Sequence, residues 1–265
     1  MKMITEIKKF GENELKLNFD GSFEKFSDDD FSCNWVYACY KDKMESFFGN
    51  DEPFEFYSNF EEAKNRKKAL DDMGCDTYLF SAEAHGGKSC PITKELVSAE
   101  LQRQCYVVLH EGWHSTVRLK DYNFNYSYEE STGRIVGLFG AIEFAKKIGD
   151  DSFLKKAEEQ EKAWSIMAEF VNQSFIEINE CLKNNKDINL LKKELNRKAT
   201  LLQNDMPDSW EKSELSKEIN NAFILRYHDY TVYYKIAKDI FNEDKNLQNS
   251  MNRFVTLAEK LEMLR

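Results

Sequence analysis

The chain has 265 residues, with 37 lysines and arginines against 47 aspartates and glutamates, so its formal net charge at pH 7 is −10. That length can bury a sizeable hydrophobic core, and the acidic balance argues against nucleic acid or an anionic membrane as a partner. The sequence has no apolar stretch long enough to cross a bilayer, and its first residues lack the apolar core of a secretory signal, so we expect no signal peptide. The six cysteines are scattered without CxxC pairing, and in a cytosolic chain of this length we expect them to be reduced and mostly buried. We therefore expect a cytoplasmic globular protein.

The first third of the chain predicts a helix packed on a small sheet. Aromatic-rich runs favour strands at Trp35–Tyr40 and Phe54–Tyr57, and a further strand is predicted at Thr77–Ala82. Between the second and third strands, a helix opens at Ser58–Asn59 and stops at Gly74, a residue type that commonly follows a helix.

After Pro91 the sequence predicts only helices. Thr93 can cap a long helix that runs to about Arg118. A polar and aromatic loop follows, and the next helix spans roughly Tyr128–Ile148 and ends at Gly149.

The carboxy-terminal part of the chain, from Ser152 onward, predicts four more helical segments. Their heptad-like apolar spacing and dense charges are typical of a bundle with solvated outer faces. The expected fold class is α+β, predominantly α, with a small N-terminal sheet and a C-terminal helical bundle. Residues 1–150 would hold the sheet and two functional helices and residues 151–265 the helical lobe, both within one catalytic unit. The breaks between the four segments are predicted near residues 184–185, 205–207 and 242–244.

The segment His110-Glu111-Gly112-Trp113-His114 has the HExxH spacing of a zinc-binding helix. Histidines four residues apart lie on one face of a helix, so both imidazoles can reach one Zn²⁺. Glu111 can approach the open coordination position and act as general base on a water molecule there. The alternative is a pair of ordinary helix histidines beside an incidental acid. The apolar run Cys105–Leu109 predicts that this helix is buried, which favours the zinc hypothesis, because a catalytic zinc needs a fixed and partly dry cavity.

A third ligand is expected on the following helix, because a catalytic zinc commonly has three protein ligands. Glu129 and Glu130 both lie in the first turn of that helix, and their spacing does not separate them. Both could instead simply favour the positive end of the helix dipole. Gly133, Gly137 and Gly140 recur at helical spacing and predict close approach of the two helices, which is also compatible with plain packing.

Several segments together resemble the bacterial putative aminopeptidase family of the gluzincin clan. In that family an HExxH helix is followed by a helix with Asn-Glu-Ser and then Val-Gly, and the counterparts here are Glu129-Glu130-Ser131 and Val136-Gly137. Asn220-Asn221-Ala222 and Tyr227-His228-Asp229-Tyr230 are similar to the family's late helix. The resemblance implies a zincin-like fold, one zinc ion as cofactor and a peptide as substrate.

The resemblance also implies roles for individual residues. It selects Glu130 as the third zinc ligand, beside His110 and His114. An electrophilic group must stabilise the oxyanion that forms as water attacks the carbonyl. The family resemblance favours Tyr230 for this role, followed by Tyr227 and His228, although each side chain could equally serve ordinary helix packing.

The strand that precedes a zincin metal helix commonly pairs with the substrate backbone. Here the corresponding segment is Ser81–His85. Glu83 could hold the free amine of a peptide, and His85 could line the pocket. Both side chains could also be polar strand-end residues that face water.

These motifs favour a zinc metallopeptidase, specifically an aminopeptidase, with Glu111 as its general base. The alternative is a non-catalytic helical interaction protein with a vestigial or structural metal site, which the charged carboxy-terminal bundle would suit. A metal-dependent hydrolase of other amides is a third possibility. The expected partner is a peptide substrate, with no nucleic acid and no membrane.

Overall fold

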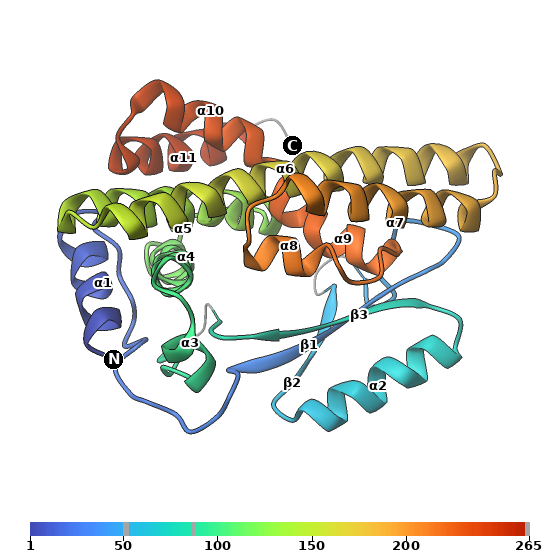
Figure 1. The fold of residues 1–265 in the computed structure, drawn as a ribbon, viewed down its shortest axis with the longest axis horizontal. Coiled ribbons are helices and arrows are strands. Elements are labelled where there is room, and N and C mark those ends of the chain that lie inside the picture. The colour runs from blue at the N-terminus through green and yellow to red at the C-terminus, as the bar shows by residue number, and fades with distance from the viewer. Residues whose placement is uncertain (50–52, 86–87, 263–265) are drawn as a thin grey trace. The chain divides into compact units, whose positions relative to one another are not determined.

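The computed structural model describes residues 1–49, 53–85 and 88–262, and within these ranges most residues are helical and three strands form one sheet (Figure 1). The predicted α+β class with a predominance of helix is confirmed. The chain divides into two compact units. Each unit combines segments from both sides of residue 150, where the sequence suggested a division. The first unit contains Met1–Ser32, Glu83–Glu161 and Val232–Arg265, and the second contains Cys33–Ala82 and Lys162–Thr231.

The second unit contains the sheet, in which β1 (Cys33–Cys39) lies between β2 (Phe54–Tyr57) and β3 (Asp76–Ala82). Both pairings are antiparallel. Helix α2 (Phe60–Asp72) packs against β1 and β3. The three predicted strands and the helix between the second and third are therefore confirmed.

The ends of α2 follow the predicted signals. The side chain of Asn59 accepts hydrogen bonds from the backbone N–H groups of Glu61 and Glu62, which satisfies donors that a helix start leaves unpaired. Gly74 has a φ of +86°, a conformation that a residue without Cβ adopts at little cost. A small core of apolar side chains joins this helix to the sheet: Val36, Ala38, Ala63, Leu70 and Cys75.

Helix α9 (Asn221–Thr231) also contacts β1 and β3. Phe223 and Tyr227 of α9 lie edge-on to Tyr78 of β3, with ring centroids 5.4 and 5.9 Å apart respectively. The second unit further includes α7 (Ile188–Asp205) and α8 (Trp210–Glu214). Helix α6 (Asp151–Lys183) continues from the first unit into the second.

In the first unit, α5 (Tyr126–Ile148) contacts four other helices of that unit. One of them, α1 (Lys2–Asn13), was not predicted from the sequence. Its buried residues include Ile4, Ile7 and Phe10, which form an apolar stripe at helical spacing. The other three are α4 (Leu101–Leu119), α10 (Tyr234–Asp244) and α11 (Leu247–Glu262).

The prediction of one long helix from Thr93 to about Arg118 is wrong. Thr93 does cap a helix, but that helix is the short α3 (Lys94–Ser98), and the chain is extended at Ala99 and Glu100 before α4 begins. The side-chain amide of Gln104 donates to the carbonyls of Val97 and Ala99. It thereby satisfies carbonyl groups that the interrupted helix would otherwise leave without partners.

The prediction of four helical segments after Ser152 is also wrong, because the described chain from residue 151 onward forms six. The predicted third segment divides into α8, α9 and α10. Asn196 of α7 stabilises the first break by bonding Ile219 through both its amide nitrogen and its oxygen. Asn220 then accepts a hydrogen bond from the Phe223 N–H group.

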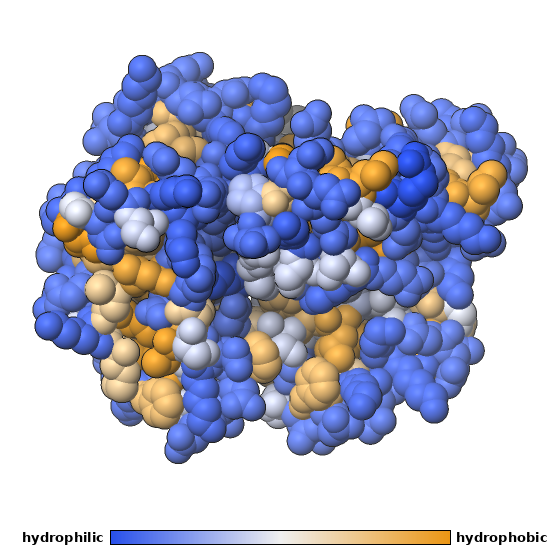
Figure 2. Space-filling view, viewed as in Figure 1, coloured by the Kyte–Doolittle hydropathy of each residue, from blue (hydrophilic) through white to orange (hydrophobic). Residues whose placement is uncertain are grey.

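The surface agrees with the charged composition. Most of the face drawn in Figure 2 is hydrophilic, with apolar residues between the polar ones. No helix in the described part of the chain combines the length and apolarity that a membrane crossing requires. All six cysteines are buried and free, as predicted.

Candidate metal centre

Helix α4 carries the two histidines on its buried side. His110 is 5% exposed, and the five residues before it, Cys105–Leu109, are all buried. The predicted burial of this helix is confirmed. The two imidazoles lie one turn apart with ring centroids 4.6 Å from each other, and their Nε2 atoms are 3.1 Å apart.

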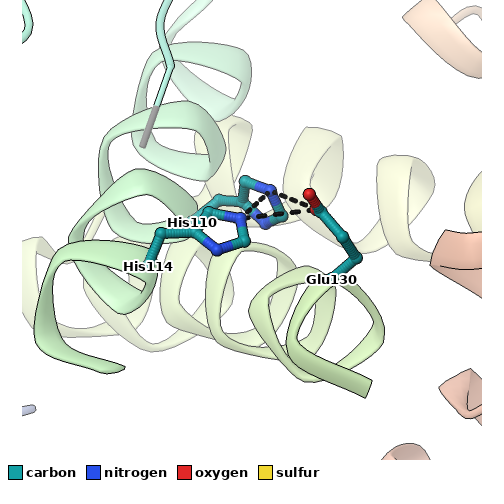
Figure 3. A group of neighbouring side chains, drawn as sticks. All are labelled: His110, His114 and Glu130. Atoms are coloured by element: carbon teal, nitrogen blue, oxygen red, sulfur yellow. Dashed lines mark hydrogen bonds and ion pairs between the residues drawn. The ribbon is translucent and has the colours of Figure 1, made fainter. Parts of the chain in front are cut away.

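Glu130 on α5 completes a group of three side chains. Its Oε2 atom lies 3.4 Å from Nε2 of His110 and 3.3 Å from Nε2 of His114. Figure 3 shows the carboxylate and the two rings directed toward one another from the two helices. Ligands about 2.0–2.1 Å from a tetrahedral ion are ~3.3 Å from each other. The three measured spacings match this value, so the group could hold a metal ion.

Glu129 has a different position from Glu130. Its Oε1 atom lies 2.6 Å from Nδ1 of His114, on the side of the ring away from the Nε2 atom. The two neighbouring acids that the sequence left unseparated therefore contact the same imidazole through different ring nitrogens.

The glycines of α5 allow the two helices to approach closely. A Cβ on Gly133 would lie 3.0 Å from Nδ1 of His110, and a Cβ on Gly137 would lie 2.6 Å from the Tyr106 ring. A Cβ on Gly140 would lie 2.5 Å from the Leu109 side chain. The predicted close packing is confirmed.

Gly112 and Trp113, inside the HExxH segment, have structural roles. A Cβ on Gly112 would come within 2.5 Å of the Phe19 ring, so any larger residue at this turn of α4 would have to displace that ring. The buried indole of Trp113 donates to Oγ1 of Thr132 over 3.0 Å. This bond joins α4 to α5 beside two of the candidate ligands.

Glu111 lies on α4 between the two histidines and remains partly accessible to solvent. Burial raises the pKa of its carboxyl to about 7, while the neighbouring His114 opposes the rise. A carboxyl group with a pKa near 7 can both accept and release a proton at neutral pH.

Glu83 is engaged by an arginine. Both of its carboxylate oxygens accept hydrogen bonds from Arg103, each over 2.9 Å, and both side chains are largely buried. Burial by itself would raise the pKa of Glu83, but the charge and hydrogen bonds of Arg103 outweigh it and lower the pKa. An amine-binding role for Glu83 would therefore have to be shared with Arg103.

His85 also has close partners. Its Nδ1 atom lies 2.5 Å from Oγ of Ser32, and its backbone N–H donates to Sγ of Cys90. Burial lowers the pKa of the His85 imidazole, which keeps the ring neutral at pH 7.

The three candidates for the oxyanion donor lie on α9 in the second unit. The hydroxyl of Tyr227 donates to the buried Glu214 over 2.6 Å. The ring of His228 stacks on Phe175 with centroids 3.7 Å apart. Tyr230 is buried, with the Arg226 guanidinium 4.1 Å from its ring centroid.

Three residues near the candidate ligands were not predicted. Tyr106 stacks on the His110 ring with centroids 5.4 Å apart, and the guanidinium groups of Arg103 and Arg134 lie 5.1 and 4.8 Å from the Tyr106 centroid. Helical spacing was an available signal, because Tyr106 precedes His110 by four residues and Arg134 follows Glu130 by four.

Two neighbouring helices that direct two imidazoles and a carboxylate to one buried point define a candidate metal centre of the two-histidine, one-glutamate kind. Residues 1–265 match the family described as "Putative aminopeptidase", and the chain belongs to that family. No match was found among curated proteins or among solved structures.

Proposed function

We propose that the protein is a zinc-dependent peptidase of the gluzincin type, with a zincin-like arrangement of its metal-binding helices. One observation carries the proposal: the triangle of donor atoms from His110, His114 and Glu130, whose edges are 3.1, 3.4 and 3.3 Å long. Membership of the aminopeptidase family supports the peptidase class.

Zinc is the metal that this set of donors suits best. Two imidazoles and one carboxylate form a common ligand set of catalytic zinc, whereas calcium and magnesium prefer oxygen ligands alone. A zinc ion held by three protein ligands would keep one coordination position for water or substrate. A bound zinc ion supplies a Lewis acid and makes water acidic enough to react near neutral pH.

Glu111 is the proposed general base. It lies next to His110 on the same helix, where its carboxylate would take a proton from the attacking water and pass it to the leaving amine.

For the group that stabilises the oxyanion, we place Tyr230 ahead of Tyr227 and His228. The hydroxyl of Tyr227 is bonded to Glu214, and the ring of His228 packs against Phe175. Tyr230 also has contacts, because the Arg226 guanidinium lies 4.1 Å from its ring centroid. The order of the three candidates therefore follows the family resemblance.

The proposed substrate is a peptide in the cytoplasm. Cleavage at a free amino terminus would follow from the family description, with Glu83 as a candidate for the amine and His85 as a candidate pocket residue. Because Arg103 neutralises much of the charge on Glu83, a protonated amine would have to compete with the guanidinium for the carboxylate oxygens.

The test is peptide hydrolysis by the wild type and by Glu111→Gln, with peptides that have free and blocked amino termini. We expect the variant to keep its zinc and to lose about 10²–10⁴-fold in kcat. Glu100→Gln is a matched control, because Glu100 pairs with Lys156 at the surface; its activity should be that of the wild type. A Glu111→Gln variant as active as the wild type would contradict the proposal.

The same assay tests the alternative of a non-catalytic interaction protein. That alternative predicts zinc binding with no hydrolysis of any peptide by the wild type. Preference for free amino termini would support the aminopeptidase assignment, whereas equal cleavage of blocked peptides would point to an endopeptidase.

A further inference from the structure

We propose that Glu129 is a positioning residue for the metal centre, which fixes the orientation of His114 and strengthens it as a ligand. The inference rests on the proposed function, because it concerns the same centre. Glu129 lies next to Glu130 in the chain but is not one of the three candidate ligands His110, His114 and Glu130.

The two nitrogens of the His114 ring face different groups. Nε2 lies 3.1 Å from Nε2 of His110 and 3.3 Å from Oε2 of Glu130, so it points to the candidate metal position. Nδ1 lies 2.6 Å from Oε1 of Glu129. If Nε2 is to donate its lone pair to a metal, Nδ1 must carry the proton and donate it to Glu129.

The surroundings favour a strong bond between these two groups. The side chain of His114 is 13% exposed and that of Glu129 is 24% exposed, so solvent and salt screen the contact only in part. A hydrogen bond to a carboxylate in such a place is shorter and stronger than one between neutral groups. The negative charge on Glu129 also makes the imidazole a better electron donor at its other nitrogen.

The first turn of α5 is fixed in place around Glu129. The side chain of Asn125 accepts from the Tyr128 N–H group, and the backbone carbonyl of Asn125 accepts from the Glu129 N–H group. The carbonyl of Glu129 accepts from the Thr132 hydroxyl, which in turn accepts from the Trp113 indole of α4. These bonds hold the backbone of Glu129 beside the helix turn that carries His114.

A series of substitutions separates the two parts of the proposed role. Glu129→Gln keeps an oxygen that can accept from Nδ1 but removes the charge, and Glu129→Ala removes both. Zinc affinity can be measured by competition with a chromophoric chelator, without reference to activity. We expect Glu129→Ala to bind zinc about 10–100-fold more weakly than the wild type, with Glu129→Gln between the two.

Glu143→Gln serves as the control on the same helix. The carboxylate of Glu143 accepts from the Leu247 N–H group and does not contact either histidine in the described structure. Its zinc affinity should equal that of the wild type. Circular dichroism and urea unfolding of each variant show whether the helices remain folded.

A second measurement reports the ring itself. The ¹⁵N shifts of His114 in the zinc-loaded protein should show a protonated Nδ1 in the wild type, with a weaker hydrogen bond at that nitrogen in Glu129→Gln. A purely structural role for Glu129 would change the free energy of unfolding and leave the zinc affinity of the folded protein unchanged.

The inference is overturned if Glu129→Ala, in its folded form, binds zinc as tightly as the wild type. That result would leave the proposed function intact. A wild-type protein that binds no zinc would instead remove the proposed function and this inference together.

Discussion

Gly133 of α5 lies directly against the imidazole of His110 on α4: a Cβ on Gly133 would be 3.0 Å from Nδ1 and 3.1 Å from Cε1 of that ring. The imidazole of His110 therefore occupies the space that Gly133 leaves on α5, the helix that carries Glu130. The position of His110 depends on the absence of a side chain three residues after Glu130.

Gly133→Ala should lower the zinc affinity of the folded protein, beyond any effect on the free energy of unfolding. The added methyl group pushes the His110 ring by a few tenths of an ångström and moves its Nε2 atom away from the other two donors. Gly140→Ala is the matched control, because its Cβ would meet Leu109 at 2.5 Å and touches no histidine. Overpacking at Gly140 should cost about 1–3 kcal/mol of unfolding free energy with no change in zinc affinity of the folded protein. Equal zinc affinities for the two variants would contradict the assigned role of Gly133.

The ion pair between Glu83 and Arg103 should make stability depend on pH. The pKa of Glu83 is lowered in the folded protein, so the pair stabilises the fold above the ordinary glutamate pKa of about 4.3 and loses its effect as the pH falls through the lowered value. Glu83→Gln should therefore reduce the free energy of unfolding by about 3 kcal/mol at pH 7, because it removes the carboxylate charge that pairs with the largely buried Arg103. The difference from the wild type should shrink below pH 4, as measured by urea denaturation across this range. A difference that stays constant down to pH 3 would show that the charge of Glu83 is not responsible.

Tyr227→Phe should destabilise the protein by about 1.5–3 kcal/mol, because the lost hydroxyl donates to a buried carboxylate. That carboxylate, Glu214, is 3% exposed and also accepts from the Tyr78 hydroxyl. Tyr57→Phe removes a similar bond to Glu55 at a more exposed position, and it should cost less than about 1 kcal/mol. Thermal or urea unfolding compares the two variants, and equal losses would contradict the structural role given to the Tyr227 hydroxyl.

Tyr230→Phe addresses the oxyanion donor. If the hydroxyl of Tyr230 stabilises the developing charge, its removal should lower kcat about 10²–10³-fold and leave KM nearly unchanged. Tyr227→Phe and His228→Gln, measured on the same peptide, should keep most of the activity of the folded protein. A Tyr230→Phe variant with wild-type kcat would return the role to one of the other two residues.

Parts of the fold that depend on local signals could be predicted from the sequence. Asn59 and Gly74 mark the ends of α2, and Asn125 and Gly149 flank α5 in the same way. Helix α1 could also have been predicted, since Ile4, Ile7 and Phe10 have helical spacing. The break between α3 and α4 could not, because it is stabilised by the Gln104 side chain rather than by a local glycine or proline.

In the candidate site, too, local sequence patterns predicted some residues, whereas the positions of others depend on how the helices pack. The spacing of His110 and His114 predicted the two imidazoles, because four residues make about one helical turn. Which of Glu129 and Glu130 faces the metal position depends on how α5 is rotated against α4, and the packing of Gly133 and Trp113 sets that rotation. The Arg103 partner of Glu83 lies 20 residues away in the chain, and no pattern in the sequence connects the two.

The zinc content of the purified protein after dialysis against zinc and then against metal-free buffer tests the central claim most directly. We predict one zinc ion per chain in the wild type and in Glu111→Gln, and a large loss of bound zinc in His110→Ala, His114→Ala and Glu130→Ala. A zinc-free wild type, or ligand variants that retain as much zinc as the wild type, would contradict the assignment of these three side chains as the metal centre.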